Sequence, residues 1–414
     1  MPSTPVPPSP TPTPAPRTVE IWTTRDDSPW LQALRQAAEP FHADHPNVTV
    51  DVSGGHVDFG QIVEDFGTGQ APDVLEPGDL VPLAARSMLR SLADRLVGSK
   101  IDPSNYVSAM WANGSWNGST YGIPALDHGP ELGLAWNTSL TATATAPTSW
   151  ADLYLFGRQL TRRDANGTIR TLGFDPLDGV GGILDTVRDV TGQEWFDPPS
   201  KRVSLDSPAY QTYLEGVVEF YNAVGIDPLS AFRKSYRPLT NTEQSAVDLG
   251  RQVAIVNGYW SVAEIARFAR DPSWQFDYAW VPSSPAGAHV QRIGGRVLGI
   301  PSVANAPDDS WALIEILSGD ATNRLFCDAV GTCAMSQSFL ATGGWSGRPG
   351  MQFYVDSIGQ ATRLTSRSSN VVTGFAETKW VQAIGEVLSG KESAPNVLKA
   401  AQAEIQAEVN RVHE

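Results

Sequence analysis

The amino-acid sequence predicts an α/β protein, in which strands and helices alternate along the chain. Residues 18–22 alternate between apolar and polar side chains, as a half-buried strand does. Ser28 and Pro29 mark a helix start, and apolar residues follow at helical spacing as far as Phe41. A second alternating strand covers 48–52. Strand, helix and strand in such close succession predict a parallel βαβ unit.

The same alternation recurs in the rest of the chain. Further strand patterns and capped helical patterns occur in turn: strands at 71–75, 253–256, 276–281 and 297–300, and helices at 149–160, 208–224 and, in two pieces separated near 391–395, at the C-terminal end. This regular alternation is typical of the α/β class. With 414 residues, 41% of them hydrophobic, the chain is long enough and apolar enough for two cores.

The charge balance bears on the possible partners. Lys and Arg total 30 against 45 Asp and Glu, which gives a formal net charge of −15. Binding of nucleic acid or of anionic lipid heads needs basic surface, so we expect no nucleic-acid partner and no direct docking on such lipids. No run of eighteen apolar residues occurs, so we expect no membrane-spanning helix.

Residues 1–17 are dominated by Pro, Ser and Thr. Proline lacks an amide hydrogen and clashes with helical neighbours, so this stretch predicts an extended, semi-rigid linker. We expect that a secretory signal and a lipid-bearing cysteine precede it. The protein would then be exported and anchored by lipid at the outer face of the cell membrane. The alternative is a plain disordered tail.

The chain has two cysteines, Cys327 and Cys333. In an exported protein this spacing predicts a local disulfide, whereas in a cytosolic protein the two would be free core thiols. His42 and His45 have no acidic or cysteine partner at metal-binding spacing, so we expect no metal site and no cofactor.

Motifs of catalysis are missing from the sequence. A Gly-x-Ser-x-Gly nucleophile elbow and a zinc-binding His-Glu-x-x-His are absent, and the glycines of 179–182 fit neither a P-loop nor a dinucleotide fingerprint. A carboxylate pair of the glycosidase kind stays open, because adjacent acids such as Asp26 and Asp27 occur. We expect a protein that is not an enzyme.

Several stretches, in order, resemble the family 1 extracellular solute-binding proteins of bacterial ABC importers, which are maltose-binding-protein-like. The similar stretches are 19–24 (opening strand and first ligand loop), 41–50 (helix end and second strand), 69–74 (a G-x-x-P-D-V signature), 121–124 with 134–137 (crossing strand), 147–153 (helix start), 250–260 (strand ending in an aromatic pair) and 294–302 (return crossing). The resemblance extends over residues 18 to 410. The two cysteines depart from the family pattern.

The resemblance implies a two-lobed periplasmic-binding-protein fold of type II. Each lobe would be a sheet flanked by helices, and crossing hinge segments would join the two. We place lobe one at 18–129 plus 291–335, and lobe two at 130–290 plus 336–414. The ligand would lie between the lobes, at loops after strand ends, and a monomer would close on it.

The implied function is that of a substrate-binding subunit, which captures a small solute and delivers it to the importer's membrane subunits. We expect a mono- or oligosaccharide, because the matching loops offer both planar polar groups for hydroxyls and aromatic rings for the sugar face. The residues assigned to the ligand are Arg25, Asp26, Glu76, Asp79, Asp127, His128, Glu131, Asp175, Tyr259, Trp260, Arg296, Phe375 and Trp380. Exposed loop charge is the alternative for the acids.

Three of these assignments have a competing structural role. Trp260 follows Asn257 and Gly258 at a strand end, and core packing is its alternative. Trp380 lies in a helical pattern that favours core packing. Arg296, like Arg292, flanks the second crossing, where a structural salt bridge is the other role. Two other functions remain: the same fold with an anionic solute, such as a glycerol phosphate or a peptide, and a carbohydrate-active enzyme. Clustered Arg and Lys in the cleft would favour the anionic solute.

Overall fold

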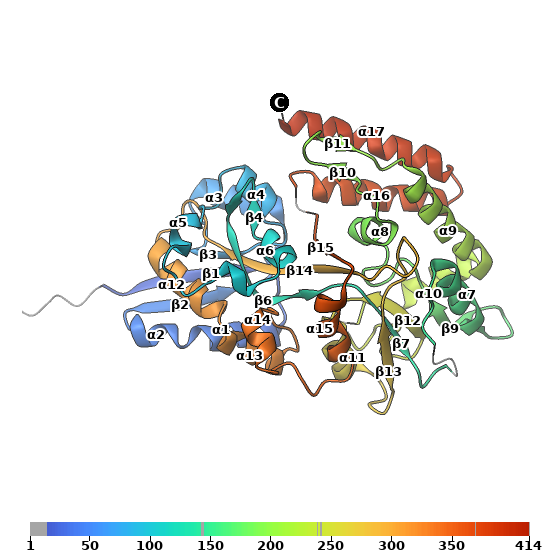
Figure 1. The fold of residues 1–414 in the computed structure, drawn as a ribbon, viewed down its shortest axis with the longest axis horizontal. Coiled ribbons are helices and arrows are strands. Elements are labelled where there is room, and N and C mark those ends of the chain that lie inside the picture. The colour runs from blue at the N-terminus through green and yellow to red at the C-terminus, as the bar shows by residue number, and fades with distance from the viewer. Residues whose placement is uncertain (1–14, 142–144, 238, 241, 369, 414) are drawn as a thin grey trace, which may run out of the picture.

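The computed structural model describes residues 15–413 except 142–144, 238, 241 and 369, so the predicted linker at 1–17 lies almost wholly outside the described residues. Two β-sheets, each flanked by helices, lie side by side (Figure 1). We call them the first and the second lobe, by the order in which their sheets begin in the chain. In the described part of the chain no helix is long and apolar enough to cross a membrane.

The first sheet has the strand order β15-β14-β3-β1-β2, with β6 paired to β14. Its strands are β1 (Arg17–Thr23), β2 (Val48–Ser53), β3 (Val74–Glu76), β6 (Gly122–Pro130), β14 (Val290–Gly299) and β15 (Arg363–Ser366). β1 pairs in parallel with β2 and with β3. The parallel βαβ unit predicted for the start of the chain is therefore confirmed.

The second sheet has the order β13-β7-β12-β9-β8. Its strands are β7 (Gly133–Asn137), β8 (Arg162–Arg163), β9 (Ile169–Phe174), β12 (Gln252–Asn257) and β13 (Phe276–Ala279). Two short hairpins complete the strands: β4 (Ser115–Trp116) with β5 (Ser119–Thr120), and β10 (Phe196–Asp197) with β11 (Arg202–Val203). β12 is buried along its whole length, as its apolar run predicts.

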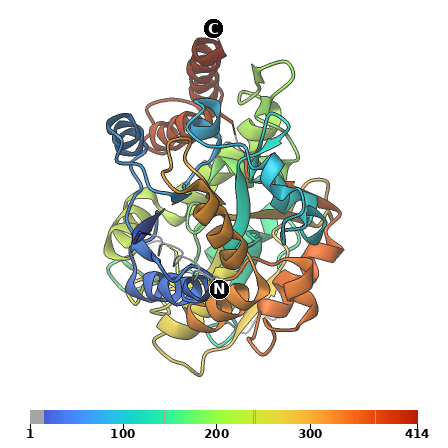
Figure 2. The ribbon, with the colours of Figure 1, turned by 90° about the vertical axis from the view of Figure 1, so that its left-hand side faces the viewer.

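Helices from distant parts of the chain cover each sheet. The first lobe contains α1 (Ser28–Ala38), α2 (Phe41–Asp44), α3 (Phe59–Thr68), α4 (Val81–Ala85), α5 (Ala93–Leu96), the 3-10 helix η1 (Pro103–Asn105), α6 (Ser108–Ala112), α12 (Pro307–Leu317), α13 (Asp320–Ala329), α14 (Gln337–Ala341) and α15 (Met351–Gln360). Viewed onto this lobe, blue N-terminal helices lie beside orange ones, in agreement with the contacts of α1 with α12 and α13 (Figure 2).

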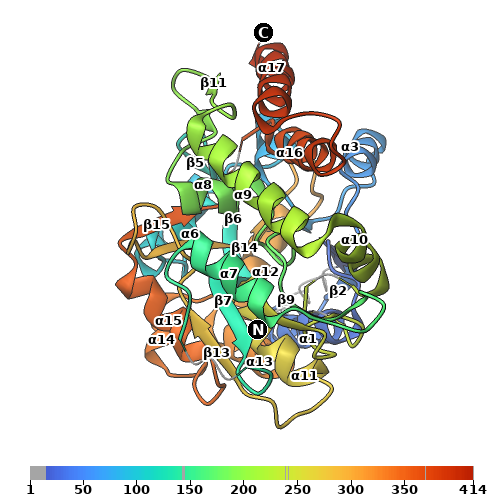
Figure 3. The same ribbon diagram turned by 90° about the vertical axis from the view of Figure 1, so that its right-hand side faces the viewer.

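The second lobe contains α7 (Trp150–Leu160), α8 (Leu184–Thr191), α9 (Pro208–Val224), α10 (Ile226–Ser235), α11 (Trp260–Phe268), α16 (Thr373–Leu388) and α17 (Ala394–His413). α9, α16 and α17 pack on one another at its outer face (Figure 3). The largest buried cluster of this lobe joins residues of α7, α9, α16 and α17 to β7, β9 and β12.

The chain passes between the two sheets three times. The passage from β6 to β7 and the strand β14 are the two crossings that the sequence predicts. The third is β15, which pairs in parallel with the first residues of β14 and leads into α16. The predicted division puts α14 and α15 in lobe two, yet their buried residues Phe339, Met351 and Tyr354 belong to the first lobe's cluster. The limits of the lobes remain a prediction.

β6 and β14 approach each other closely where they cross. A bulge interrupts their pairing between Gly295 and Val297. Gly295 has a φ of +144°, and a Cβ atom on it would lie 2.1 Å from the carbonyl oxygen of Asp127. Only glycine fits this position, because any side chain would push the two crossing strands apart.

Candidate functional site

A cavity of about 530 Å³ lies between the two lobes, beside the crossing strands. We call it the central cavity. Charged and aromatic side chains from both lobes line it: Arg25, Asp26, Asp27 and Trp30 from the first lobe, Trp260, Glu264, Arg267 and Phe268 from the second, and Asp127, Glu131, Arg296 and Arg367 from the crossing segments. The cavity therefore lies at the loops that follow strand ends, where ligands of α/β folds bind.

The first-lobe wall is the turn from β1 into α1. Asp27 caps α1 by accepting a hydrogen bond from the amide of Trp30 at 3.1 Å. The same carboxylate accepts from Nε of Arg25 at 2.7 Å, and the Arg25 guanidinium lies 4.8 Å from the centre of the Trp30 ring. The cap thus fixes the turn, and Asp26 is left without an ion pair to any described residue.

The second-lobe wall is the start of α11, directly after β12. Gly258 separates the strand from the helix, and a Cβ atom on it would lie 2.2 Å from the ring of Trp260. The glycine therefore gives the indole room to fold back at the edge of the cavity. Glu264 and Arg267 follow at four and seven residues, so they lie on the same face of the helix as Trp260.

The crossing segments place two carboxylates at the back of the cavity. The hydroxyl of Tyr259 donates to Oδ1 of Asp127 at 2.5 Å. Glu131 accepts from Nε of Arg292 at 2.8 Å and forms a second ion pair with Arg367. These two arginines hold the pKa of Glu131 down, at about 2, against the opposing effect of burial.

Arg292 connects the crossing strands to the second lobe. Its side chain is fully buried, and besides Glu131 it contacts Asp189 and Thr186 of α8, each at 3.0 Å. The structural salt bridge considered for this residue is therefore confirmed. Removal of either partner would leave a buried charge unpaired, which is strongly destabilising.

A second cavity of about 370 Å³ adjoins the central one, and Gly295 and Arg367 line both. Other lining residues come from the loop before α4, the end of α6, α8 with the loop after it, and the first turns of α16, among them Asp79, Asn113, Asp185, Trp195, Thr373 and Glu377. Together the two cavities form one elongated, polar space between the lobes, with Arg367 at the junction.

Three of the four arginines of the central cavity already have acidic partners. Arg25 pairs with Asp27, Arg296 with Glu76 and Arg367 with Glu131. Arg267 has no ion pair among the residues that the structure describes, and its guanidinium lies 5.0 Å from the ring of Phe268. The arginines are thus mostly neutralised, and the cavity as a whole is not a cationic site.

One acid of the cavity titrates near neutrality. Burial raises the pKa of Glu264 to about 7, although Thr240 donates a hydrogen bond to it at 2.7 Å. In the second cavity, burial also raises the pKa of Glu377 to about 7. Protonated carboxyls donate hydrogen bonds as well as accept them, so near pH 7 both groups are able to serve either side of a hydroxyl.

Seven of the predicted ligand residues line these two cavities. They are Arg25, Asp26, Asp127, Glu131, Trp260 and Arg296 in the central cavity, and Asp79 in the second. The other six, which do not line either cavity, are Glu76, His128, Asp175, Tyr259, Phe375 and Trp380.

Three of these six support the cavity from behind. Glu76 is buried and accepts from Arg296 at 3.0 Å. His128 is buried against the backbone oxygen of Arg296, 2.9 Å from its Nδ1, and burial lowers its pKa to about 4, so it is neutral. Tyr259 is buried and holds Asp127. They orient groups that reach the cavity.

Of the remaining three, two are buried inside the second lobe and Phe375 is partly buried at its edge. Asp175 accepts a hydrogen bond from Tyr221 at 2.8 Å and is buried. Phe375 packs against the second-lobe cluster. Trp380 is fully buried, and its indole nitrogen donates to the oxygen of Gly182 at 2.8 Å. Its place is the core, as its helical pattern favours.

Sequence reasoning missed Glu264, Arg267, Arg367 and Glu377. A signal existed for the first two, since they follow Trp260 at helical spacing and share its face. Arg367 lies in a short polar run after β15, which has no periodic pattern and comes from the crossing that the sequence did not reveal. Nothing in the sequence separates Glu377 from other helical glutamates.

The two cysteines are free thiols in the structure, and both are buried, so the predicted disulfide is not formed there. Their side chains are hydrogen-bonding neighbours, and the proximity of Cys333 lowers the pKa of Cys327 to about 7. Among the described residues, no group of three His, Cys, Asp or Glu side chains lies close enough to hold a metal ion.

Comparison with known proteins agrees with this architecture. The profile of the family described as "Bacterial extracellular solute-binding protein" matches residues 36–352. No curated protein sequence matches the chain. Among solved structures, CpMnBP1 with mannobiose bound has a TM-score of 0.81 at 20% identity, over 94% of this chain and 99% of that one.

Two further structures extend the comparison. The maltose/maltodextrin-binding domain MalE from Bdellovibrio bacteriovorus, bound to maltotriose, has a TM-score of 0.74 at 16% identity, over 95% of this chain and 100% of that one. The ABC substrate-binding protein Lmo0181 from Listeria monocytogenes, in complex with cycloalternan, has 0.76 at 14%, over 95% and 99%. The predicted two-lobed fold is confirmed.

Proposed function

The chain belongs to the bacterial extracellular solute-binding proteins, and from this premise we propose that it is the substrate-binding subunit of an ABC importer that captures a mono- or oligosaccharide between its lobes. The observation that carries the proposal is the central cavity, in which Trp260 lies beside carboxylates and arginines from both lobes. A sugar ring offers an apolar face to an indole and hydroxyls to planar polar groups. The related structures with mannobiose and maltotriose support this ligand class.

The second cavity supports a ligand longer than one ring. It adjoins the central cavity at Arg367 and brings Asp79, Asn113 and Glu377 to the same elongated space. An anionic solute is less well matched, because three of the four central arginines already have carboxylate partners. The proposal includes binding without turnover, a monomeric protein, a lipid anchor ahead of the linker, and delivery to the importer's membrane subunits.

A thermal-shift series tests the ligand class. Mannobiose, mannotriose and maltotriose would be compared with glycerol 3-phosphate as the anionic control. A ligand that binds only the folded protein, at 1,000 times its Kd, stabilises it by about 4 kcal/mol. We expect at least one sugar to raise the melting temperature and the phosphate to leave it unchanged. A shift with the phosphate alone would contradict the proposal, and recovery of altered sugar would point to an enzyme.

A further inference from the structure

The loop between α13 and α14 reaches across from the first lobe to the second. It begins at Val330, and its first residues, 330–332, lie between Cys327 in the last turn of α13 and Cys333. Val330 and Thr332 line the central cavity. Gly331, between them, has a φ of +83°, a conformation that favours glycine. The tip of the loop is therefore part of the first-lobe wall of the cavity.

Gly331 lies directly against α11 of the second lobe. A Cβ atom on it would lie 2.0 Å from Cβ of Ala263 and 3.5 Å from Nη1 of Arg348. The Ala263 methyl is attached to a helix and has no torsion by which it can turn away. The loop and α11 can therefore approach this closely only because Gly331 has no side chain.

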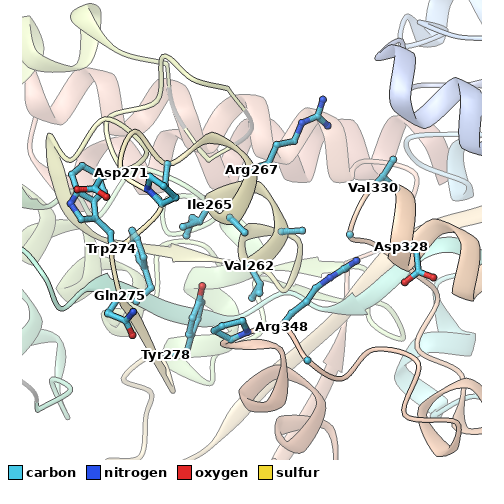
Figure 4. Close-up of a pocket in the computed structure, with 18 of the residues that line it drawn as sticks. Val262, Ile265, Arg267, Asp271, Trp274, Gln275, Tyr278, Asp328, Val330 and Arg348 are labelled. Atoms are coloured by element: carbon cyan, nitrogen blue, oxygen red, sulfur yellow. The ribbon is translucent and has the colours of Figure 1, made fainter.

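The same contact separates two cavities. Ala263 and Val330 line the central cavity and also a cavity of about 530 Å³ on the other face of α11. In Figure 4, Val330 and Asp328 come from the right, opposite Val262 of α11, and Arg348 points toward them from below. The loop thus seals the central cavity at the place where the two lobes meet.

The loop is held firmly at both ends. Arg348 donates to the backbone oxygen of Cys327. The backbone oxygen of Cys333 accepts from the amide of His128 at 3.1 Å, and the amide of Cys333 donates to the hydroxyl of Tyr259 at 3.2 Å. Because His128 belongs to the crossing strand β6 and Tyr259 is the N-cap residue of α11, the C-terminal end of the loop is bonded to a crossing strand and to the second lobe.

We propose that Gly331 and Ala263 form a closure stop, a glycine-to-methyl contact that sets how far the two lobes close. The width of the central cavity then depends on one missing side chain. This goes beyond the proposed function, and it rests on that function only where it concerns the affinity for sugar.

The experiment uses three variants of the whole protein. Gly331→Ala places a methyl group against Ala263, and Gly331→Ala with Ala263→Gly removes the opposing methyl again. Gly343→Ala is the matched control, since Gly343 has a φ of +66° and no neighbour within 4 Å of an added Cβ, so it adds similar backbone strain without a clash. The readouts are the radius of gyration by small-angle scattering and the Kd for whichever of mannobiose and maltotriose stabilises the wild type more.

We expect Gly331→Ala to increase the radius of gyration and to weaken sugar binding at least tenfold. The double variant should restore both, and the control should change neither. Wild-type radius and Kd in Gly331→Ala, or no recovery in the double variant, would overturn the closure stop. If neither sugar binds the wild type, the proposed function fails. The radii of gyration of the four ligand-free proteins still test whether Gly331 and Ala263 form the closure stop.

Discussion

Two helices of the second lobe, α11 and α16, make an instructive pair. Both begin where the lobes meet, and each carries a tryptophan and a glutamate whose pKa burial raises to about 7. Trp260 is the first residue of α11 and lines the central cavity. Trp380 lies in the middle of α16 and is fully buried against the lobe's core.

The two tryptophans differ in burial because their helices are connected to the sheet in different ways. α11 follows directly from β12, so its first residue lies at the edge of the sheet, where the crevice is. α16 is entered from the third crossing, and Trp380 is two turns into the helix, on the face that packs on Tyr210 and Tyr213. An aromatic residue at a strand-to-helix junction is thus the better candidate for a ligand contact than one inside a helix.

The largest effect should come from Trp380→Ala. Truncation of a fully buried tryptophan leaves a cavity in the core and should cost about 3–5 kcal/mol of unfolding free energy. Sugar affinity of the remaining folded protein should be unchanged. Chemical denaturation and calorimetric titration measure the two quantities. A stable variant with weak binding would reverse the roles assigned to the two tryptophans.

The next effect concerns the two cysteines beside the loop that contacts α11. No corresponding loop with cysteines is described beside α16. If the exported protein joins Cys327 and Cys333, the short loop between them predicts a stabilisation of about 2–3 kcal/mol at most. We expect no reactive thiol in denatured, unreduced protein, and two after reduction. If two thiols are labelled without reductant, the cysteines are free in solution, as they are in the structure.

Trp260→Ala should act on binding and leave stability almost untouched. Stacking on a sugar face contributes on the order of 1–3 kcal/mol, so affinity should fall about 10- to 100-fold. The melting temperature of the ligand-free protein should stay near the wild-type value. Titration calorimetry and a ligand-free melt separate this outcome from that of Trp380→Ala. A much lower melting temperature with normal affinity would place Trp260 in the core.

The smallest effect is a change in pH dependence. Because the pKa of Glu264 is raised in the folded state to about 7, its carboxyl favours folding at low pH, and this contribution is lost as the pH rises from about 4.5 to 7. Glu264→Gln should therefore flatten the decline of melting temperature over that range. Glu377→Gln should do the same, for the same reason.

Sugar affinity should distinguish the two glutamates. Glu264 shares a helix face with Trp260. In the Glu264→Gln variant, the change of sugar affinity between pH 6 and pH 8 should therefore become smaller. In Glu377→Gln the pH dependence should persist for a sugar that occupies only the central cavity, since Glu377 lines the second cavity. Equal loss in both variants would mean that the two cavities act on the sugar as one.

The sequence predicted the fold class and the crevice side of the sheets well, because period-two and helical patterns report burial directly. Of the residues it predicted for the ligand, Arg25 and Trp260, which follow strand ends, and Asp127, which lies within β6, line the central cavity. Glu76 and Tyr259, also predicted, line neither cavity, because a residue behind the cavity wall and one on its surface have the same position relative to the strand. The third crossing was missed because β15 is short and only partly buried, without an apolar run.

The three passages between the sheets have a consequence for how the molecule is assembled. The first lobe's cluster joins Val19 and Trp30 to Phe326 and Tyr354, and the second lobe's joins Leu153 to Val409. Neither core is complete until residues from beyond the last crossing, or just before it, have joined. A chain still under synthesis therefore holds two half-built interiors. The first lobe reaches its final packing only after α15 and β15 have been made, and the second only after α16 and α17.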